Sequence, residues 1–99
     1  MSWWNPWEED KNTCVVDAKV QEVRLSDIGV DARVLVIKRK SGIDHAICIW
    51  IEKDGLMAAW DKNGTRWIGY HTFDDPPYSI ASDALIKEGV DVVKSATWL

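Results

Sequence analysis

Three residue types that can make up a thiol catalytic triad occur in this sequence, in the order Cys14, His45 and Asp61. In such a triad the cysteine attacks as a thiolate, an imidazole takes up the thiol proton, and a third group orients the imidazole. Asn63 is an alternative for the third role, because an amide can also hold one imidazole tautomer. The chemistry that this set predicts is nucleophilic catalysis by a thiolate.

The element that must position Cys14 is predicted to be a helix over residues 13–27. Thr13 is a suitable N-cap, Gly29 supplies a stop, and four apolar residues recur at helical spacing: Cys14, Ala18, Leu25 and Ile28. At the start of this helix the sulfur would lie near unsatisfied backbone N–H groups, which lower the pKa of a thiol. Residues 16–20 also alternate as a strand would, so a strand over residues 14–25 stays open.

The remaining elements are mostly strands. They are expected at residues 32–38, 45–51, 56–61, 65–72 and 90–99, with a short helix that Ser79 or Ser82 caps and that runs through Lys87. Both faces of residues 45–51 are largely apolar, which predicts a central strand that begins at His45. The pattern predicts an α+β fold in which an N-terminal helix packs on a mainly antiparallel sheet, with a small all-β barrel as the alternative.

The turn between the second and third strands decides whether His45 and Asp61 can meet. A three-residue loop at residues 53–55 places His45 opposite Asn63, with Asp61 as the diagonal neighbour on the same face. A two-residue loop, Asp54 and Gly55, shifts the register and sends His45 and Asp61 to opposite faces. The triad therefore requires the three-residue loop or a bulge.

Several short stretches together resemble the core of the transglutaminase-like cysteine peptidases. They are residues 13–18 (TCVVDA), 27–36 (DIGVDARVLV), the pair His45 and Ala46, residues 54–56 (DGL), and the pair Trp60 and Asp61. In that family a cysteine begins a helix, a Gly-hydrophobic-x-Ala-Arg stretch opens the first strand, and histidine and aspartate follow on the next two strands. The resemblance covers residues 13–61, just over half of the chain, and implies a minimal form of that core.

By this resemblance Cys14 is the nucleophile, His45 the base and Asp61 the orienting group. The implied activity is thiol attack on an amide carbonyl of a peptide or protein substrate, followed by hydrolysis or by acyl transfer to an amine. No metal or organic cofactor is implied. The expected oxyanion donors are Asn12, Asn5, an indole N–H of Trp4 or Trp7, or the backbone N–H of Cys14.

Composition narrows the other classes of function. The chain has 99 residues, a net charge of −4 and seven tryptophans, and its largest basic cluster is residues 38–40. One domain is expected, with residues 1–12 as an irregular tryptophan-rich arm whose Trp4 and Trp7 either pack on the core or line a substrate groove. A nucleic-acid partner is not expected, nor is a membrane span, and the default location is the cytosol.

The sequence contains a second cysteine and a second histidine, and it also allows a function without catalysis. Cys48 lies within an apolar strand and is expected to be a core thiol, and His71 is a weaker rival for the base. The alternative function is a small protein-binding or inhibitory module without catalysis. Its surface would present tryptophans, which are favoured interface anchors, at Trp3, Trp4, Trp7 and Trp67.

Overall fold

The computed structural model describes the backbone of residues 6–89 and 91–99, and the side chains from residue 14 onward apart from residue 90. The protein is α+β. Its elements, in chain order, are α1 (Pro6–Asp27), β1 (Ala32–Arg39), β2 (Asp44–Ile51), β3 (Met57–Asp61), β4 (Gly64–Gly69), α2 (Pro77–Ala84), a short 3-10 turn η1 (Ile86–Glu88), and β5 (Val93–Trp98).

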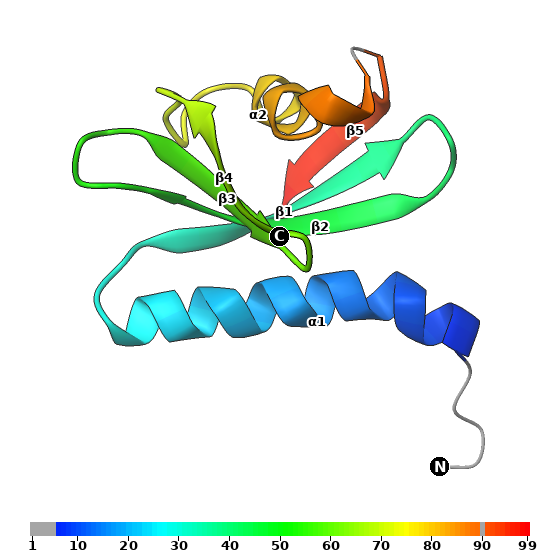
Figure 1. Ribbon diagram of the computed structural model, residues 1–99, viewed down its shortest axis with the longest axis horizontal. Helices are drawn as coiled ribbons and strands as arrows, with labels where there is room; N and C mark the ends of the chain where they lie inside the picture. Colours follow the sequence, from blue (N-terminus) through cyan, green and yellow to red (C-terminus); the bar gives the residue numbers. More distant parts are fainter. Residues whose placement is uncertain (1–5, 90) are drawn as a thin grey trace.

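The five strands form one open antiparallel sheet in the order β4-β3-β2-β1-β5. Figure 1 shows α1 lying along one face of this sheet and α2 covering the other. Residues 14–25 are helical and the sheet does not close on itself, so the small all-β barrel is wrong. The expected central position of β2, between β1 and β3, is confirmed.

The sheet carries a separate apolar core on each face, because side chains alternate along every strand. On the α2 face, Ile47 and Ile49 of β2 pack with Ile80 of α2. On the α1 face, Cys48 and Ala46 of β2 pack with Ala18 of α1. Burial on both sides explains why β2 reads as a nearly continuous apolar run.

The first helix begins earlier than the sequence pattern predicts. It starts at Pro6, a residue that is favoured in the first turn of a helix, so Thr13 lies inside α1 and is not its N-cap. Residues 6–12, expected to belong to an irregular arm, are helical, and residues 1–5 of that arm lie outside the described residues. Of the β-branched residues in this stretch, Val16, Val20 and Val23 are exposed on α1, whereas Val15 packs against the core between α1 and the sheet.

The loop between β2 and β3 has three residues, as the triad requires. Cys48 pairs with Trp60, and Ile51 pairs with Met57. The backbone N–H of Glu52 donates to the carbonyl oxygen of Leu56 at 2.9 Å, so the turn consists of residues 53–55. Gly55 has a φ of +92°, a left-handed conformation that favours glycine and closes three-residue hairpins. The register that places His45 and Asp61 on one face is therefore confirmed.

The later elements differ from expectation mainly at their ends. β4 stops at Gly69, where φ is +109°, so residues 70–72 are not part of the strand. The helix α2 begins at Pro77, before both of its predicted caps, Ser79 and Ser82. Within the described part of the chain, no helix combines the length and apolar character that crossing a bilayer demands.

Candidate active site

His45 and Asp61 are in direct contact, as the hairpin register predicts. His45 is the second residue of β2 and Asp61 is the last residue of β3. The distance from His45 Nε2 to Asp61 Oδ2 is 2.8 Å, and the two side chains are 11% and 6% exposed. Such burial shields the hydrogen bond from competing water.

Asp61 accepts two further hydrogen bonds that hold its carboxylate in place. The backbone N–H of Asn63 donates to Oδ1 at 2.8 Å, and Arg66 Nη2 donates to Oδ2 at 3.2 Å. Burial alone would raise the pKa of Asp61, but the hydrogen bonds from His45, Arg66 and Asn63, with the positive charge of Arg66, hold that pKa below its ordinary value. Asp61 is therefore a carboxylate at neutral pH.

The charge of Asp61 determines which nitrogen of His45 carries the proton. An ionised carboxylate can only accept hydrogen bonds, so the contact at Nε2 requires that this nitrogen be the donor. In the neutral imidazole the other nitrogen, Nδ1, then holds a lone pair. His45 is thus prepared to accept a proton at Nδ1.

Cys14 lines the same pocket as this pair. The cavity has a volume of about 160 Å³. Its walls come from α1, from the start of β2, and from the end of β3 with the turn that follows: Cys14, Asp17, His45, Ala46, Trp60, Asp61, Lys62 and Asn63. The structure therefore brings all three residues of the predicted triad to one cavity, with the hydrogen bond between His45 and Asp61 inside the set.

The thiol and the imidazole approach this pocket from different faces of the sheet. Cys14 is half-buried against the α1-side core, a cluster that includes Ala46 and Cys48. His45 pairs with Ile37, which belongs to the α2-side core, and Asp61 is bound to Arg66, whose Nε donates to Ala84 O of α2. The pocket opens at the end of the sheet, where β2 starts and β3 stops, so side chains from both faces can line it.

The predicted position of Cys14 at a helix N-terminus is wrong. Because α1 starts at Pro6, Cys14 lies about two turns inside the helix, beyond the reach of the unsatisfied N–H groups of the first turn. Its own backbone N–H belongs to the helical hydrogen-bond ladder, so that group is not available as an oxyanion donor. Any activation of the thiol must therefore come from the side chains of the pocket.

The other predicted site residues have mixed outcomes. Asn63 lines the pocket and its backbone N–H supports Asp61, but the contact with the His45 imidazole is made by Asp61. Asn12 and Trp7 lie in the first turns of α1, and their side chains fall outside the described residues, as does all of Trp4. Their predicted roles in oxyanion or substrate binding stay predictions.

The sequence analysis missed Arg66, which contacts Asp61 directly. Strand alternation offered a signal, because Arg66 and the buried Ile68 are two residues apart in β4 and so share a face. An arginine on the inward face of a strand requires an acceptor, and Asp61 supplies one. Its partner on the neighbouring strand β3, Ala59, leaves room for the side chain to cross towards Asp61.

Cys48, the expected core thiol, and His71, the alternative base, lie outside the pocket that Cys14 lines. Cys48 is fully buried in the α1-side core, and burial, assisted by the charge of Glu22, raises the pKa of its thiol to about 12. Its expected core role is confirmed. Both ring nitrogens of His71 contact carboxylates, Nδ1 with Asp75 Oδ2 at 2.9 Å and Nε2 with Asp83 Oδ2 at 2.6 Å.

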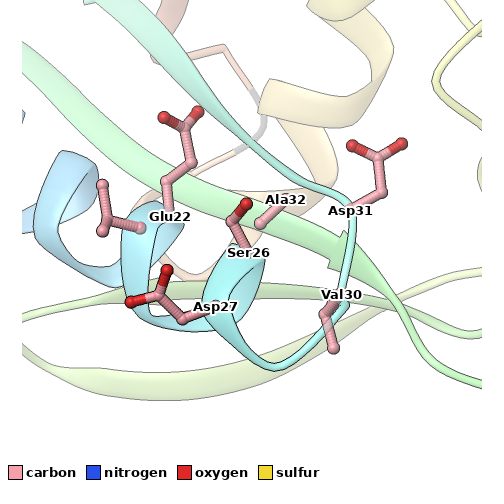
Figure 2. Close-up of a pocket in the computed structure, with 7 residues that line it drawn as sticks. Glu22, Ser26, Asp27, Val30, Asp31 and Ala32 are labelled. Atoms are coloured by element: carbon pink, nitrogen blue, oxygen red, sulfur yellow. The ribbon is translucent and has the colours of Figure 1, made fainter.

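A larger cavity lies at the opposite end of α1, and its lining differs in kind. It has a volume of about 210 Å³ between the last turns of α1 and the start of β1, and Figure 2 shows the side chains of Glu22, Ser26, Asp27 and Asp31 around it. These are carboxylates and one hydroxyl, with no thiol or imidazole among its lining residues. It cannot perform the proton transfer that thiolate chemistry needs.

Comparisons with protein-family models, with curated proteins and with solved structures give no match to this chain. Among the side chains that the structure describes, no three from His, Cys, Asp and Glu form a group that could hold a metal ion. What the site can do is therefore inferred from the pocket that Cys14, His45 and Asp61 share.

Proposed function

We propose that the protein is a thiol-dependent amide hydrolase or acyl transferase with the core layout of the transglutaminase-like cysteine peptidases. In this proposal Cys14 is the nucleophile, His45 the general base and Asp61 the orienting group. The observation that carries it is one pocket lined by a cysteine and by a buried, hydrogen-bonded His45 and Asp61 pair. Its substrate would be a peptide, an isopeptide or a glutamine side chain.

The order of elements supports the same layout. A cysteine on an N-terminal helix is followed by a strand that opens at Ala32 and Arg33, then by histidine on β2 and aspartate on β3. The family that the sequence resembles has its elements in this order. The resemblance covers residues 13–61, which run from within α1 to the end of β3.

The proposed reaction follows from the protonation state of the pair. His45 Nδ1 takes the proton of the Cys14 thiol, and the thiolate attacks the amide carbonyl carbon to give a tetrahedral intermediate. When the C–N bond breaks, the imidazolium gives this proton to the leaving amine, and a thioester on Cys14 remains. Water or a second amine then attacks the thioester and gives a proton to His45. The C–S bond breaks, and the Cys14 thiolate takes this proton back from His45.

The pocket restricts what can reach the sulfur. A volume of about 160 Å³ suits a single side chain or a short stretch of backbone rather than a large ligand. Trp60 supplies an apolar wall, while Asp17 and Lys62, 3.5 Å apart, place both signs of charge in the lining. This arrangement favours a polar, uncharged group such as a carboxamide at the reacting position.

The test is the pH dependence of Cys14 alkylation by iodoacetamide, followed site by site with mass spectrometry. We expect Cys14 to react rapidly well below the ordinary thiol pKa of about 8.5, and to lose this reactivity in His45→Ala. His71→Gln is the matched control, since it removes the other histidine, and Cys48 is the internal control in every sample. Equal Cys14 profiles in the wild type and His45→Ala would exclude a thiolate and imidazolium pair.

A non-catalytic binding module is the second candidate function. Trp67 on the edge strand β4 is 55% exposed, and an exposed indole is a frequent anchor at interfaces. In this case Cys14→Ala would retain the cellular effect of the protein while Trp67→Ala removed it. The reverse result, loss with Cys14→Ala alone, favours the enzyme.

A further inference from the structure

Arg66 joins three elements around the acidic residue of the pocket. Its Nη2 donates to Asp61 Oδ2 at 3.2 Å, and its Nε donates to the carbonyl oxygen of Ala84 at 2.9 Å. Ala84 is the last residue of α2, where helix carbonyls lack an intrahelical partner. The guanidinium thus connects β4 with the end of β3 and with the end of α2.

The oxygen that Arg66 contacts is the one that orients the imidazole. Asp61 Oδ2 accepts from both His45 Nε2 and Arg66, while Oδ1 accepts from the backbone of Asn63. Three donors at different positions hold the carboxylate against rotation about its terminal bond. Without Arg66, Oδ2 would keep its hydrogen bond with His45 but lose the second donor, so the carboxylate could move more easily away from the imidazole.

Arg66 also balances the charge of Asp61 when His45 is neutral. Among the described side chains, Arg66 forms the ion pair with Asp61 that comes from a permanently charged group. The neighbouring Lys62 pairs with Asp17 instead, at 3.5 Å. On the α2 side, Lys87 and Glu88 line a cavity that Asp61 also borders, and Glu88 pairs with Arg39 at 3.0 Å. These groups face the site but do not bind Asp61 in the structure.

We propose that Arg66 is a positioning residue, which clamps the Asp61 carboxylate and thereby keeps the His45 proton on Nε2 and the lone pair on Nδ1. If the Asp61 carboxylate turned away from Nε2, the imidazole proton could move to Nδ1, which would leave no acceptor for the thiol. This inference rests on the proposed function for its catalytic meaning. The clamp itself is a statement about Asp61 and His45 alone.

The two contacts of Arg66 require a guanidinium fork. Nε and Nη2 are separate donors on one plane, so one side chain can bind Asp61 and Ala84 at once. A lysine carries the same charge on one nitrogen and would hold Asp61 less firmly. We therefore expect Arg66→Lys to fall between the wild type and Arg66→Gln.

The experiment follows Asp61 and His45 directly by NMR, with carboxyl ¹³C shifts for the titration of Asp61 and ring ¹⁵N shifts for the His45 tautomer. In Arg66→Gln we expect the midpoint of Asp61 to rise by about one pH unit and the fraction of Nδ1-protonated His45 to increase. Alkylation of Cys14 should slow in proportion to the loss of His45 molecules that carry their proton on Nε2. Arg33→Gln, which removes an exposed arginine paired with Asp31, is the matched control and should leave all three measurements unchanged.

The outcomes separate this inference from the proposed function. If Arg66→Gln is folded and shows the wild-type Asp61 midpoint and His45 tautomer, the inference is overturned whatever Cys14 does. If those two signals shift as expected but Cys14 of the wild type lacks rapid reaction at low pH, the clamp stands and the proposed function fails. Should Arg66→Gln not fold, Arg66→Lys carries the test, and wild-type values of both signals would again overturn the clamp.

Discussion

The two histidines of this protein both contact aspartates, yet their surroundings prepare them for different tasks. His45 has one carboxylate, at Nε2, and shares that carboxylate with Arg66. His71 has two, one at each ring nitrogen, and the partners Asp75 and Asp83 are 38% and 51% exposed. In His45 the carboxylate contact is at Nε2, whereas in His71 both ring nitrogens contact carboxylates.

The two histidines differ in how many of their ring nitrogens are bound to carboxylates, and this difference bears on the pKa of His71. Burial would lower the pKa of His71, but hydrogen bonds and charges from Asp83 and Asp75 raise it above its ordinary value. When His71 is protonated, both of its nitrogens donate to these carboxylates, so it then has no lone pair for a thiol proton. His71 is also not among the residues that line the pocket of Cys14, whereas His45 is.

Asp61→Asn should have the largest effect, because it removes the negative charge that His45 and Arg66 both contact. Arg66 and His45 would lose a buried carboxylate, and we expect unfolding free energy to fall by about 2 kcal/mol at pH 7 in urea titrations. The pKa of Asp61 is lowered in the fold, so its contribution is present above the ordinary carboxyl pKa of about 4 and is lost as pH falls through the lowered value. The difference between Asp61→Asn and the wild type should thus shrink in acid.

The matched control for that change is Asp83→Asn, which removes a carboxylate from the other histidine. It should leave the alkylation profile of Cys14 unchanged, whereas Asp61→Asn should remove reaction at low pH. Equal profiles for the two variants would mean that the two histidine sites do not differ as described.

Gly55→Ala should have the next largest effect, and it bears on the first histidine site alone. With φ at +92°, an added Cβ strains the backbone although the nearest atom, in the Tyr70 ring, is 3.7 Å away. We expect a loss of about 1 kcal/mol in unfolding free energy, with the His45 and Asp61 hydrogen bond intact by NMR. A gain in stability would show that the loop does not hold the left-handed conformation in solution.

His71→Gln should cause a smaller loss of stability that depends on pH in the opposite direction to that of Asp61→Asn. Because the folded pKa of His71 is raised, its contribution is fully present below the ordinary histidine pKa of about 6.5 and disappears as pH rises through the raised value. The melting temperature of the variant should therefore lie below that of the wild type at pH 5.5 and approach it at pH 9.5. A constant difference across this range would contradict the ion cluster.

Lys62→Gln should have the smallest effect, and it tests whether charge without burial matters at the pocket. Lys62 and Asp17 lie 3.5 Å apart with side chains 52% and 31% exposed, and such pairs contribute at most about 1 kcal/mol and often nothing measurable. We expect an unfolding midpoint within error of the wild type, both at low salt and at 0.5 M NaCl. A loss of unfolding free energy as large as that of Asp61→Asn would contradict the prediction that burial makes the difference.

The hairpin that aligns His45 with Asp61 is the part of the site that sequence could predict. Gly55 predicts a tight hairpin turn of two or three residues, and the alternation of Ile47, Ile49 and Ile51 indicates which side chains share a face with His45. Both signals are local, since each depends on residues a few positions apart. The sequence left a two-residue loop open as well, and the pairing of Ile51 with Met57 in the structure selects the three-residue loop.

The start of α1 and the role of Arg66 could not be predicted, for different physical reasons. Thr13 carries the sequence signature of a cap, but a helix that is already nucleated at Pro6 continues through a threonine at little cost. Arg66 depends on which strand lies beside β3 and on where α2 ends, and both are properties of the packed sheet. Local patterns contain neither of them.

The placement of β5 beside β1 has a consequence for how the chain reaches this fold. The strands β1 to β4 join by short antiparallel connections, whereas Trp98 of β5 must pair with Leu35 across most of the sequence. Contacts between distant residues carry a greater loop-closure entropy and form late. Until then the free edge of β1 has unpaired backbone groups, so β5 is the strand whose delay would expose a newly made chain to aggregation.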